Sequence, residues 1–397
     1  MFRHSCQTGP GHGVNGSMMT KNIFKAPLFT LALSLIGLSV AHAQPRVSSI
    51  RPELLKKVTK TPKPSIEFDV INSPYASWGV MPQESSSINL LGAWKKFEKK
   101  KEVVVAVIDT GIDPNHPFLK DNLKGAKGSA SASDYGMDFS KSAVNEYQPV
   151  DQHGHGTHVS GIIKSVYPDV KILSLKYYNP KASGQDNLDS TIKALRYAVE
   201  ANVDIINYSG GGPEPAIEEL RILKEAERKG ILVVAAAGNE ESNIDVKKNA
   251  YYPASYGLSN IITVTAHDQS LQMLSSSNYG AKSVDISAPG YRIKSALPGG
   301  RSGFLTGTSQ ATAFVSGVAA MLKSQGPGLS AAQMKQIIVA SAKKENTMAG
   351  KCSSGGRLDA TKAVADSVNE ISGRKVAQRD PSSKKKTPGK IVYRLTK

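Results

Sequence analysis

The run Val103-Val-Val-Ala-Val-Ile-Asp-Thr-Gly111 is apolar without interruption until it reaches an acid, Asp109. A short apolar run without polar alternation is typical of a strand that is covered on both faces, as strands of a parallel sheet are. Similar runs recur farther along the chain. They span residues 170–175, 204–208, 231–237 and 261–265, and together they predict a buried parallel sheet.

Helical patterns separate these strands. Residues 189–201 place apolar side chains on one face, with Asp189 in position to cap the helix start. Residues 216–229 form a charged amphipathic pattern that stops at Gly230, and residues 90–97 carry apolar side chains at helical spacing. This alternation predicts an α/β fold of three layers around a doubly wound, mostly parallel sheet. In such a sheet, functional residues gather at the carboxyl ends of the strands.

Three segments carry residue types that can perform nucleophilic catalysis. Asp109 follows the first strand, His155 stands in the segment 153–161 (HGHGTHVSG), and Ser309 stands in the segment 307–313 (GTSQATA). A hydroxyl is a poor nucleophile at neutral pH and needs a base within reach. An imidazole serves as that base when a buried carboxylate orients it and stabilises its protonated form. We therefore predict that Ser309 is the nucleophile, His155 the general base and Asp109 the orienting acid.

The order Asp, His, Ser and the three motifs around these residues resemble the subtilase (subtilisin-like) serine protease family. The resemblance covers residues 78–370. It includes a fourth motif at 235–239, AAAGN. The resemblance implies that Asn239 and the backbone N–H of Ser309 form an oxyanion hole.

The resemblance also implies where a substrate binds. Residues 207–211 (NYSGG) resemble the family's substrate-binding strand, whose backbone would pair with an extended peptide. The pocket for the side chain before the scissile bond would lie between 207–211 and 235–238. Tyr251 stands where smaller residues often floor that pocket, so we expect large side chains to be disfavoured there. The predicted substrate-binding residues are Asn207, Ser209, Gly210, Gly211, Ala236 and Gly238.

The sequence favours a protein without a metal or other cofactor. His155 and His158 are three residues apart, but no acid lies between them as a zinc-protease helix requires. Where many relatives supply an aspartate to calcium, this chain has Phe118, and residues 161–168 lack the family's asparagine-rich insertion. Because calcium needs oxygen ligands, we predict that this strong calcium site is absent. A weaker site elsewhere remains open.

The helix after the predicted nucleophile departs from the family pattern. Gln310, Ala313 and Phe314 stand where a methionine, a proline and a histidine are typical. None of these positions supplies triad chemistry, so the departure leaves the predicted reaction intact. The change from proline to Ala313 restores a backbone N–H near the helix start.

The charge and the N-terminus indicate an exported protein. The net charge is +17, of which residues 1–43 carry +3 and residues 373–397 carry +8. Lys21 and Lys25 precede an apolar run and the pattern Ala41-His-Ala43, which predicts a signal peptide over residues 1–43. An uncleaved anchor helix is the alternative. We assign residues 44–74 to a linker or short pro-segment, 75–372 to a subtilisin-like peptidase domain and 373–397 to a basic flexible tail.

These observations lead to one hypothesis and one alternative. The hypothesis is a secreted or periplasmic serine endopeptidase that acts on proteins or peptides. We expect no nucleic-acid partner and no stable membrane span after signal cleavage, although the basic tail could touch anionic surfaces. The alternative is a catalytically silent subtilase-fold protein that binds peptides or the cell envelope. The presence of Asp109, His155, Ser309 and Asn239 favours the enzyme.

Overall fold

The computed structural model describes residues 66–127, 131, 133–141 and 143–373. The predicted signal peptide, and the basic tail from residue 374 onward, lie outside the described residues. The described residues all belong to one compact unit.

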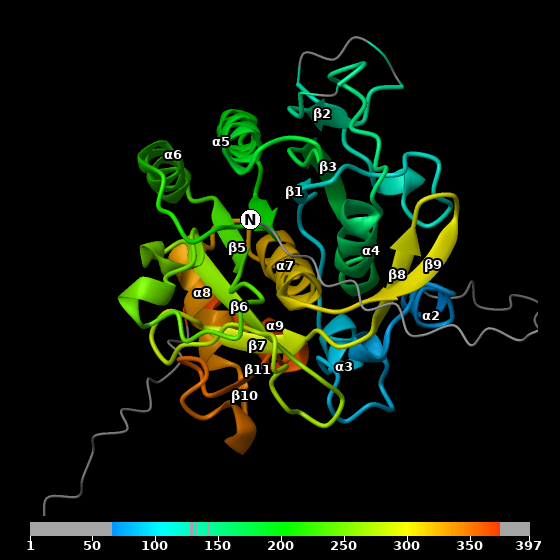
Figure 1. Ribbon diagram of the computed structural model, residues 1–397. Coiled ribbons are helices and arrows are strands. Elements are labelled where there is room, and N and C mark those ends of the chain that lie inside the picture. Colours follow the sequence, from blue (N-terminus) through cyan, green and yellow to red (C-terminus); the bar gives the residue numbers. More distant parts are fainter. Residues whose placement is uncertain (1–65, 128–130, 132, 142, 374–397) are drawn as a thin grey trace, which may run out of the picture. The chain divides into compact units, whose positions relative to one another are not determined.

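A nine-stranded sheet forms the centre of this unit (Figure 1). Its strand order is β10-β11-β7-β6-β5-β4-β1-β3-β2, and every neighbouring pair is parallel except β10 and β11. The strands are β1 Val104–Asp109, β2 Gly136–Asp138, β3 Lys171–Lys176, β4 Ile205–Tyr208, β5 Leu232–Ala236, β6 Ile261–His267, β7 Ile286–Pro289, β10 Lys343–Lys344 and β11 Gly356–Arg357. All five strands predicted from the sequence are therefore confirmed, each within one or two residues.

The central strands are buried on both faces, as their apolar runs predict. Val105 and Val107 of β1 pack into one hydrophobic core, while Ala106 and Ile108 pack into a second core on the opposite face. The alternation follows from the period of two along a strand. Two cores on one sheet require two layers of helices, so the predicted three-layer α/β fold is confirmed.

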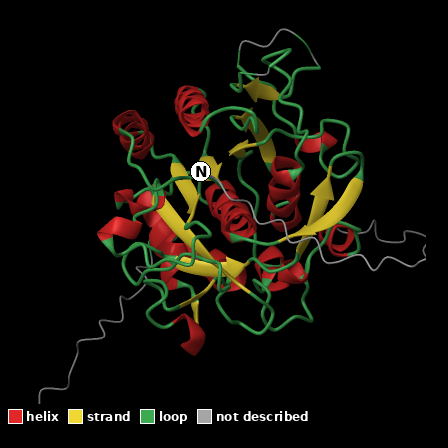
Figure 2. Cartoon of the chain, in the orientation of Figure 1, coloured by secondary structure: helices red, strands yellow, loops and turns green. Residues whose placement is uncertain are grey.

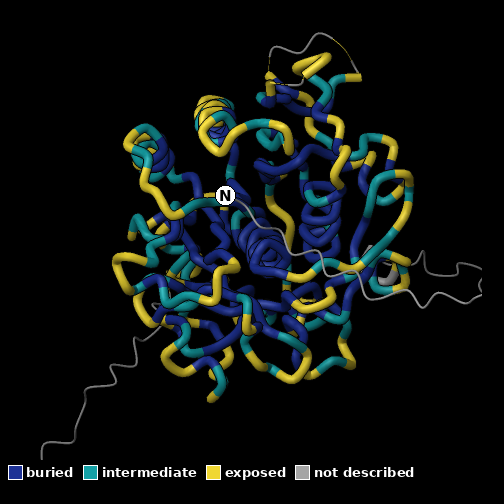
Figure 3. The backbone as a smooth tube through the Cα atoms, in the orientation of Figure 1, coloured by how far each residue is buried: buried dark blue, intermediate teal, exposed yellow. Residues whose placement is uncertain are grey.

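The two helical layers differ in composition. The layer on one face contains α3 Leu90–Trp94, α4 His155–Val166, α7 Thr308–Gln325, α8 Ala331–Ala340 and α9 Ala360–Ile371, whereas the layer on the other contains α5 Gly184–Glu200 and α6 Ile217–Arg228 (Figure 2). Helix α7 is buried along almost its whole length (Figure 3). It packs against α4 and against the central strands.

A two-stranded hairpin stands apart from the main sheet. Its strands, β8 Ile293–Leu297 and β9 Arg301–Leu305, are antiparallel, and β8 packs against α4. Gly161 of α4 allows this approach, because a Cβ built there would lie 2.3 Å from Ser295 Oγ. The hairpin ends three residues before α7 begins, so it leads directly into the segment that holds Ser309.

Some element boundaries differ from the sequence-based expectations. Helix α5 begins at Gly184 rather than near Asp189, because Ser183 caps the helix six residues before Asp189 and forms a reciprocal capping box with Asp186. Helix α3 ends at Trp94 rather than at residue 97. The segment assigned to a linker contains the short helix α2, Ile66–Ile71, and Val70 of that helix packs into the main core.

Other elements of the structure were not predicted from the sequence. They include the strands β2, β7, β10 and β11, the hairpin β8–β9, and the helices α8 and α9. Within the described part of the chain, no helix has both the length and the apolar character needed to cross a membrane.

Candidate active site

The three predicted catalytic residues stand on three different elements at one edge of the sheet. Asp109 is the last residue of β1, His155 is the first residue of α4, and Ser309 is the second residue of α7. The chain places β3 and β2 on one side of β1 and then continues with β4 on the other side. Such a change of direction opens a crevice beyond the strand ends, where ligands bind in doubly wound folds.

Asp109 and His155 form a direct pair. The His155 Nδ1 atom lies 2.8 Å from Oδ1 and 3.0 Å from Oδ2 of Asp109. Asp109 is almost fully buried, and its Oδ1 also accepts the backbone N–H of Thr110 at 2.8 Å. Because the carboxylate accepts a hydrogen bond from Nδ1–H, the proton of the neutral imidazole stays on Nδ1, and the Nε2 atom is unprotonated and able to act as a base.

The environment of His155 sets its protonation. Burial disfavours the charged imidazolium, but the negative charge of Asp109, its hydrogen bond and the charge of Asp151 favour it. The balance raises the pKa of His155 above its ordinary value. The charge that develops on the imidazole during proton transfer is therefore stabilised within the site.

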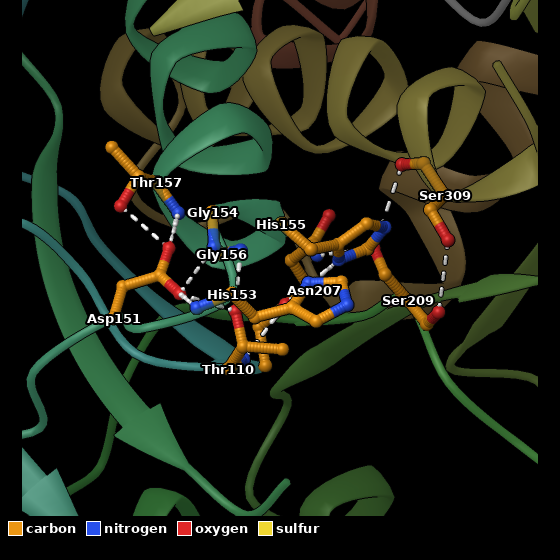
Figure 4. Close-up of polar contacts among 11 residues, drawn as sticks. Thr110, Asp151, His153, Gly154, His155, Gly156, Thr157, Asn207, Ser209 and Ser309 are labelled. Carbon is orange, nitrogen blue, oxygen red and sulfur yellow. Dashed lines mark hydrogen bonds and ion pairs between the residues drawn. The ribbon is translucent and has the colours of Figure 1, made fainter. Parts of the chain in front are cut away.

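Ser309 lies beside the end of β4. Its hydroxyl donates to the backbone carbonyl of Ser209 at 3.0 Å, and the Ser209 hydroxyl donates to the Ser309 carbonyl at 3.4 Å (Figure 4). The hydroxyl must therefore turn away from Ser209 before it can give its proton to His155. Such a rearrangement is ordinary, since catalytic hydrogen bonds often tighten only when substrate is bound.

Asn239 is oriented by the start of α7. Its Oδ1 accepts the backbone N–H of Thr308 at 3.0 Å and the Thr308 hydroxyl at 3.3 Å. Because the oxygen is engaged, the amide NH₂ group is the donor that remains to face a ligand. The backbone N–H of Ser309 belongs to the first turn of α7, where N–H groups have no partner within the helix. The Asn239 side chain and the Ser309 backbone N–H therefore both lie at the start of α7.

Asp151 is a site residue that the sequence analysis missed. This buried carboxylate accepts the backbone N–H groups of His153, Gly154 and Thr157 at 3.0, 2.7 and 2.9 Å. It also accepts the hydroxyls of Thr110 and Thr157 at 2.9 and 2.6 Å (Figure 4). These bonds cap the start of α4 and join it to the residue after Asp109. The acid four residues before His155, just ahead of a helix, was the signal available in the sequence.

His158 has a structural position. Its Nε2 atom lies 2.9 Å from the carbonyl of Ile293 and 3.2 Å from that of Gly303, so it links α4 to the hairpin. Burial lowers its pKa to about 3, which keeps the ring neutral. Among the described residues, no group of three or more His, Cys, Asp and Glu side chains is arranged to hold a metal ion.

The predicted substrate-binding residues lie at or just after the ends of β4 and β5. Ser209, Gly210 and Gly211 directly follow β4. Asn207 is fully buried: its amide donates to the Ser209 hydroxyl at 2.9 Å and accepts the Ser316 hydroxyl at 2.9 Å. It therefore supports the segment that follows β4 from behind. Ala236 ends β5, and Gly238 follows two residues later with φ 99°.

Comparisons with known proteins show which family the chain belongs to. A family model described as the subtilase family matches residues 100–369. The major intracellular serine protease of Bacillus subtilis (strain 168) is 35% identical over 264 residues, which cover 64% of this chain and 79% of that protein. Subtilisin amylosacchariticus of Bacillus subtilis subsp. amylosacchariticus is 34% identical over 305 residues, with 74% of each chain covered.

A solved structure supports the same conclusion. A chain from a study of the assembly of subtilase cytotoxin SubAB superposes with a TM-score of 0.61 and 26% identity, covering 74% of this chain and 97% of that chain. The match of the family model extends from the strand β1 to the last helix and includes every residue of the predicted triad. The sequence relatives are named as serine proteases or subtilisins. This chain belongs to the subtilase family of serine proteases.

Proposed function

We propose that this protein is an exported serine endopeptidase that hydrolyses peptide bonds through an acyl-enzyme on Ser309. One observation carries the proposal. Both carboxylate oxygens of the buried Asp109 lie within 3.0 Å of His155 Nδ1, at the sheet edge where Ser309 and Asn239 also lie. The proposal assigns the base to His155, the nucleophile to Ser309 and the oxyanion donor to Asn239.

In the first step, Ser309 Oγ attacks the carbonyl carbon of the substrate while its proton passes to His155 Nε2. The carbonyl oxygen gains negative charge and accepts hydrogen bonds from the Asn239 amide and the Ser309 backbone N–H. The C–N bond then breaks, and His155 gives its proton to the departing amine. The products of this step are an amine and an ester between the acyl half of the substrate and Ser309.

In the second step, water replaces the amine. His155 takes a proton from the water as its oxygen attacks the ester carbon, and the same two donors hold the oxyanion. The ester C–O bond breaks, the proton returns from His155 to Ser309 Oγ, and a carboxylic acid leaves. Asp109 remains ionised throughout and stabilises the imidazolium in each step.

Active-site labelling tests the proposal directly. The purified mature protein should react with a fluorophosphonate probe, which forms a covalent bond only with an activated serine. Ser309→Ala should abolish both labelling and peptide hydrolysis. Ser302→Ala is the matched control, because Ser302 lies on β9 seven residues before the nucleophile, outside the predicted site. That variant should label as the wild type does.

The result separates the enzyme from its alternative. If a folded wild-type protein neither labels nor hydrolyses peptides after removal of any pro-segment, the peptidase proposal fails. Binding of peptides without turnover would then favour the catalytically silent protein. Such a protein would not need the hydrogen bonds that orient His155 and Asn239.

Export is part of the same proposal and has its own support, the basic and apolar pattern over residues 21–43. One named relative is an intracellular protease, so family membership leaves the location open. Mass spectrometry of protein recovered outside the cytoplasm should find an N-terminus at Gln44 or later. Recovery of the whole chain from the cytoplasm alone would contradict export.

A further inference from the structure

Two glycines leave a slot between the ends of β4 and β5, beside the predicted nucleophile. Gly211 lies two residues after Ser209, whose carbonyl accepts the Ser309 hydroxyl. Gly238 precedes Asn239, whose side chain contacts Thr308. We call the space between these two glycines the glycine slot. Neither wall presents a Cβ atom, so the slot could admit a side chain from another segment.

The ring of Tyr251 occupies this slot. A Cβ atom built on Gly211 would lie 2.5 Å from Cε1 of Tyr251, and one built on Gly238 would lie 3.1 Å from Cδ2. These two ring atoms belong to opposite edges of the ring, so the ring spans the slot from one glycine to the other. Tyr251 is only 9% exposed. The space therefore has no room for a second large side chain.

The backbone holds Tyr251 in this position. The neighbouring residue Tyr252 exchanges two backbone hydrogen bonds with Gly212, at 3.0 and 2.8 Å. Tyr251 itself accepts the backbone N–H of Ser255 at 2.8 Å and donates to the Ser255 hydroxyl at 3.0 Å. Movement of the ring out of the slot would have to break this anchoring or expose a buried aromatic surface, and both are unfavourable.

The reaction geometry places one half of the substrate against the slot. His155 must protonate the leaving amine, so the amine half of the peptide lies on the His155 side of Ser309. The acyl half then lies on the other side, along the residues that follow β4 and β5. The glycine slot lies between those two segments, so it is the space open to the side chain just before the scissile bond, and the Tyr251 ring already stands there.

We propose that Tyr251 restricts the residue before the scissile bond to glycine or alanine. The inference rests on the proposed peptidase function and adds the class of substrate. A side chain larger than a methyl group would overlap the ring of Tyr251. The protein thus cleaves after small residues, and the size limit is set by one replaceable side chain.

Peptide p-nitroanilides that differ only in this residue test the proposal. Wild-type kcat/KM should be at least about 10-fold higher for alanine than for phenylalanine, the discrimination expected when pocket volume decides binding. Tyr251→Gly empties the slot and should raise the phenylalanine-to-alanine ratio of kcat/KM by about 100-fold. Tyr252→Ala is the control: it removes a neighbouring ring outside the slot, and it should leave this ratio unchanged.

Each outcome has a defined meaning. Equal wild-type cleavage after phenylalanine and alanine would overturn the proposal, as would an unchanged ratio in a folded Tyr251→Gly protein. If that variant does not fold, the wild-type protein alone decides. An alanyl phosphonate inhibitor should inactivate it at least about 10-fold faster than the phenylalanyl analogue, and equal rates would reject the size limit. Resistance to both inhibitors and to the fluorophosphonate would instead reject the peptidase function, and the inference with it.

Discussion

The contact between Asp109 and His155 both orients the imidazole ring and makes it more basic. The two Asp109 oxygens lie within 3.0 Å of Nδ1, which fixes the plane of the ring. The same negative charge opposes burial and raises the pKa of His155. A general base works best when its pKa lies near the pH at which the enzyme operates. The contact therefore affects both the geometry of the base and the pH at which it acts.

A change of Asp109 should separate these two effects. Catalysis needs neutral His155, so kcat/KM should rise with pH through the pKa of that residue, at a midpoint above the ordinary value of about 6.5. Asp109→Asn removes the charge, so the midpoint should fall, and kcat should drop by about 10⁴-fold because the wrong tautomer is favoured. The measurement is a pH profile of kcat/KM. A variant with an unchanged midpoint would show that Asp109 does not raise this pKa.

At this scale the sequence motifs predict which side chains react but not what positions them. Asp109, His155, Ser309 and Asn239 belong to short motifs, and the structure brings them to one edge of the sheet. Asp151 was missed because its role depends on five donors converging on one carboxylate. An isolated acid in a loop gives no indication of such convergence.

At the scale of elements, the site depends on how closely α4 and α7 approach each other. Gly317 of α7 makes that approach possible, because a Cβ atom there would lie 2.5 Å from Cβ of Val166 and 3.1 Å from the carbonyl oxygen of Ile163. The two helices carry His155 and Ser309 at their starts. A change in their spacing would therefore alter the distance between the base and the nucleophile.

Gly317→Ala should lower both stability and activity. The added methyl group should cost about 1–3 kcal/mol through overpacking, partly offset by about 0.5–1 kcal/mol of improved helix propensity. Urea unfolding measures the first effect and kcat for a peptide substrate the second. Gly184→Ala is the control, since a Cβ atom on this residue of α5 meets nothing within 4 Å and should not destabilise the protein. A Gly317→Ala protein as stable as the wild type would contradict the close contact.

The strength of each sequence pattern decided which elements could be predicted. The central strands have uninterrupted apolar runs because both of their faces are covered. Strand β9 is largely exposed or half-buried, so its residues carry no comparable run. The start of α5 was placed six residues too late because Asp189 and Ser183 are both acceptable caps in sequence. Only the hydrogen bonds of the capping box show that Ser183 is used.

At the scale of the whole molecule, we consider the segment around Phe118, where the sequence predicts that the strong calcium site is absent. Phe118, at the position where relatives supply an aspartate, stacks on Tyr75 with ring centroids 5.0 Å apart. The Lys164 ammonium lies 4.7 Å from the centroid of Phe118 and donates to the Phe118 carbonyl at 2.5 Å. A cation that belongs to the chain itself thus contacts this segment. We propose that Lys164 stabilises the domain here without bound calcium.

Thermal unfolding tests this replacement across the whole domain. If no strong calcium site is present, a chelator should change the free energy of unfolding by less than about 1 kcal/mol. The unfolding temperature should then shift by less than about 2 °C, because 1 kcal/mol corresponds to about 2–4 °C in domains of 150–250 residues. Lys164→Met keeps the aliphatic stem but removes the ammonium, and it should cost about 1–2 kcal/mol through the lost hydrogen bond and cation–π contact. Lys171→Met is the control, because the Lys171 ammonium donates to the backbone carbonyl of Asp121 at an exposed position. This substitution should change the free energy of unfolding by less than about 0.5 kcal/mol. Chelator-induced unfolding that added calcium reverses would show a strong calcium site and contradict the proposal, because the domain would then depend on a cation that Lys164 does not supply.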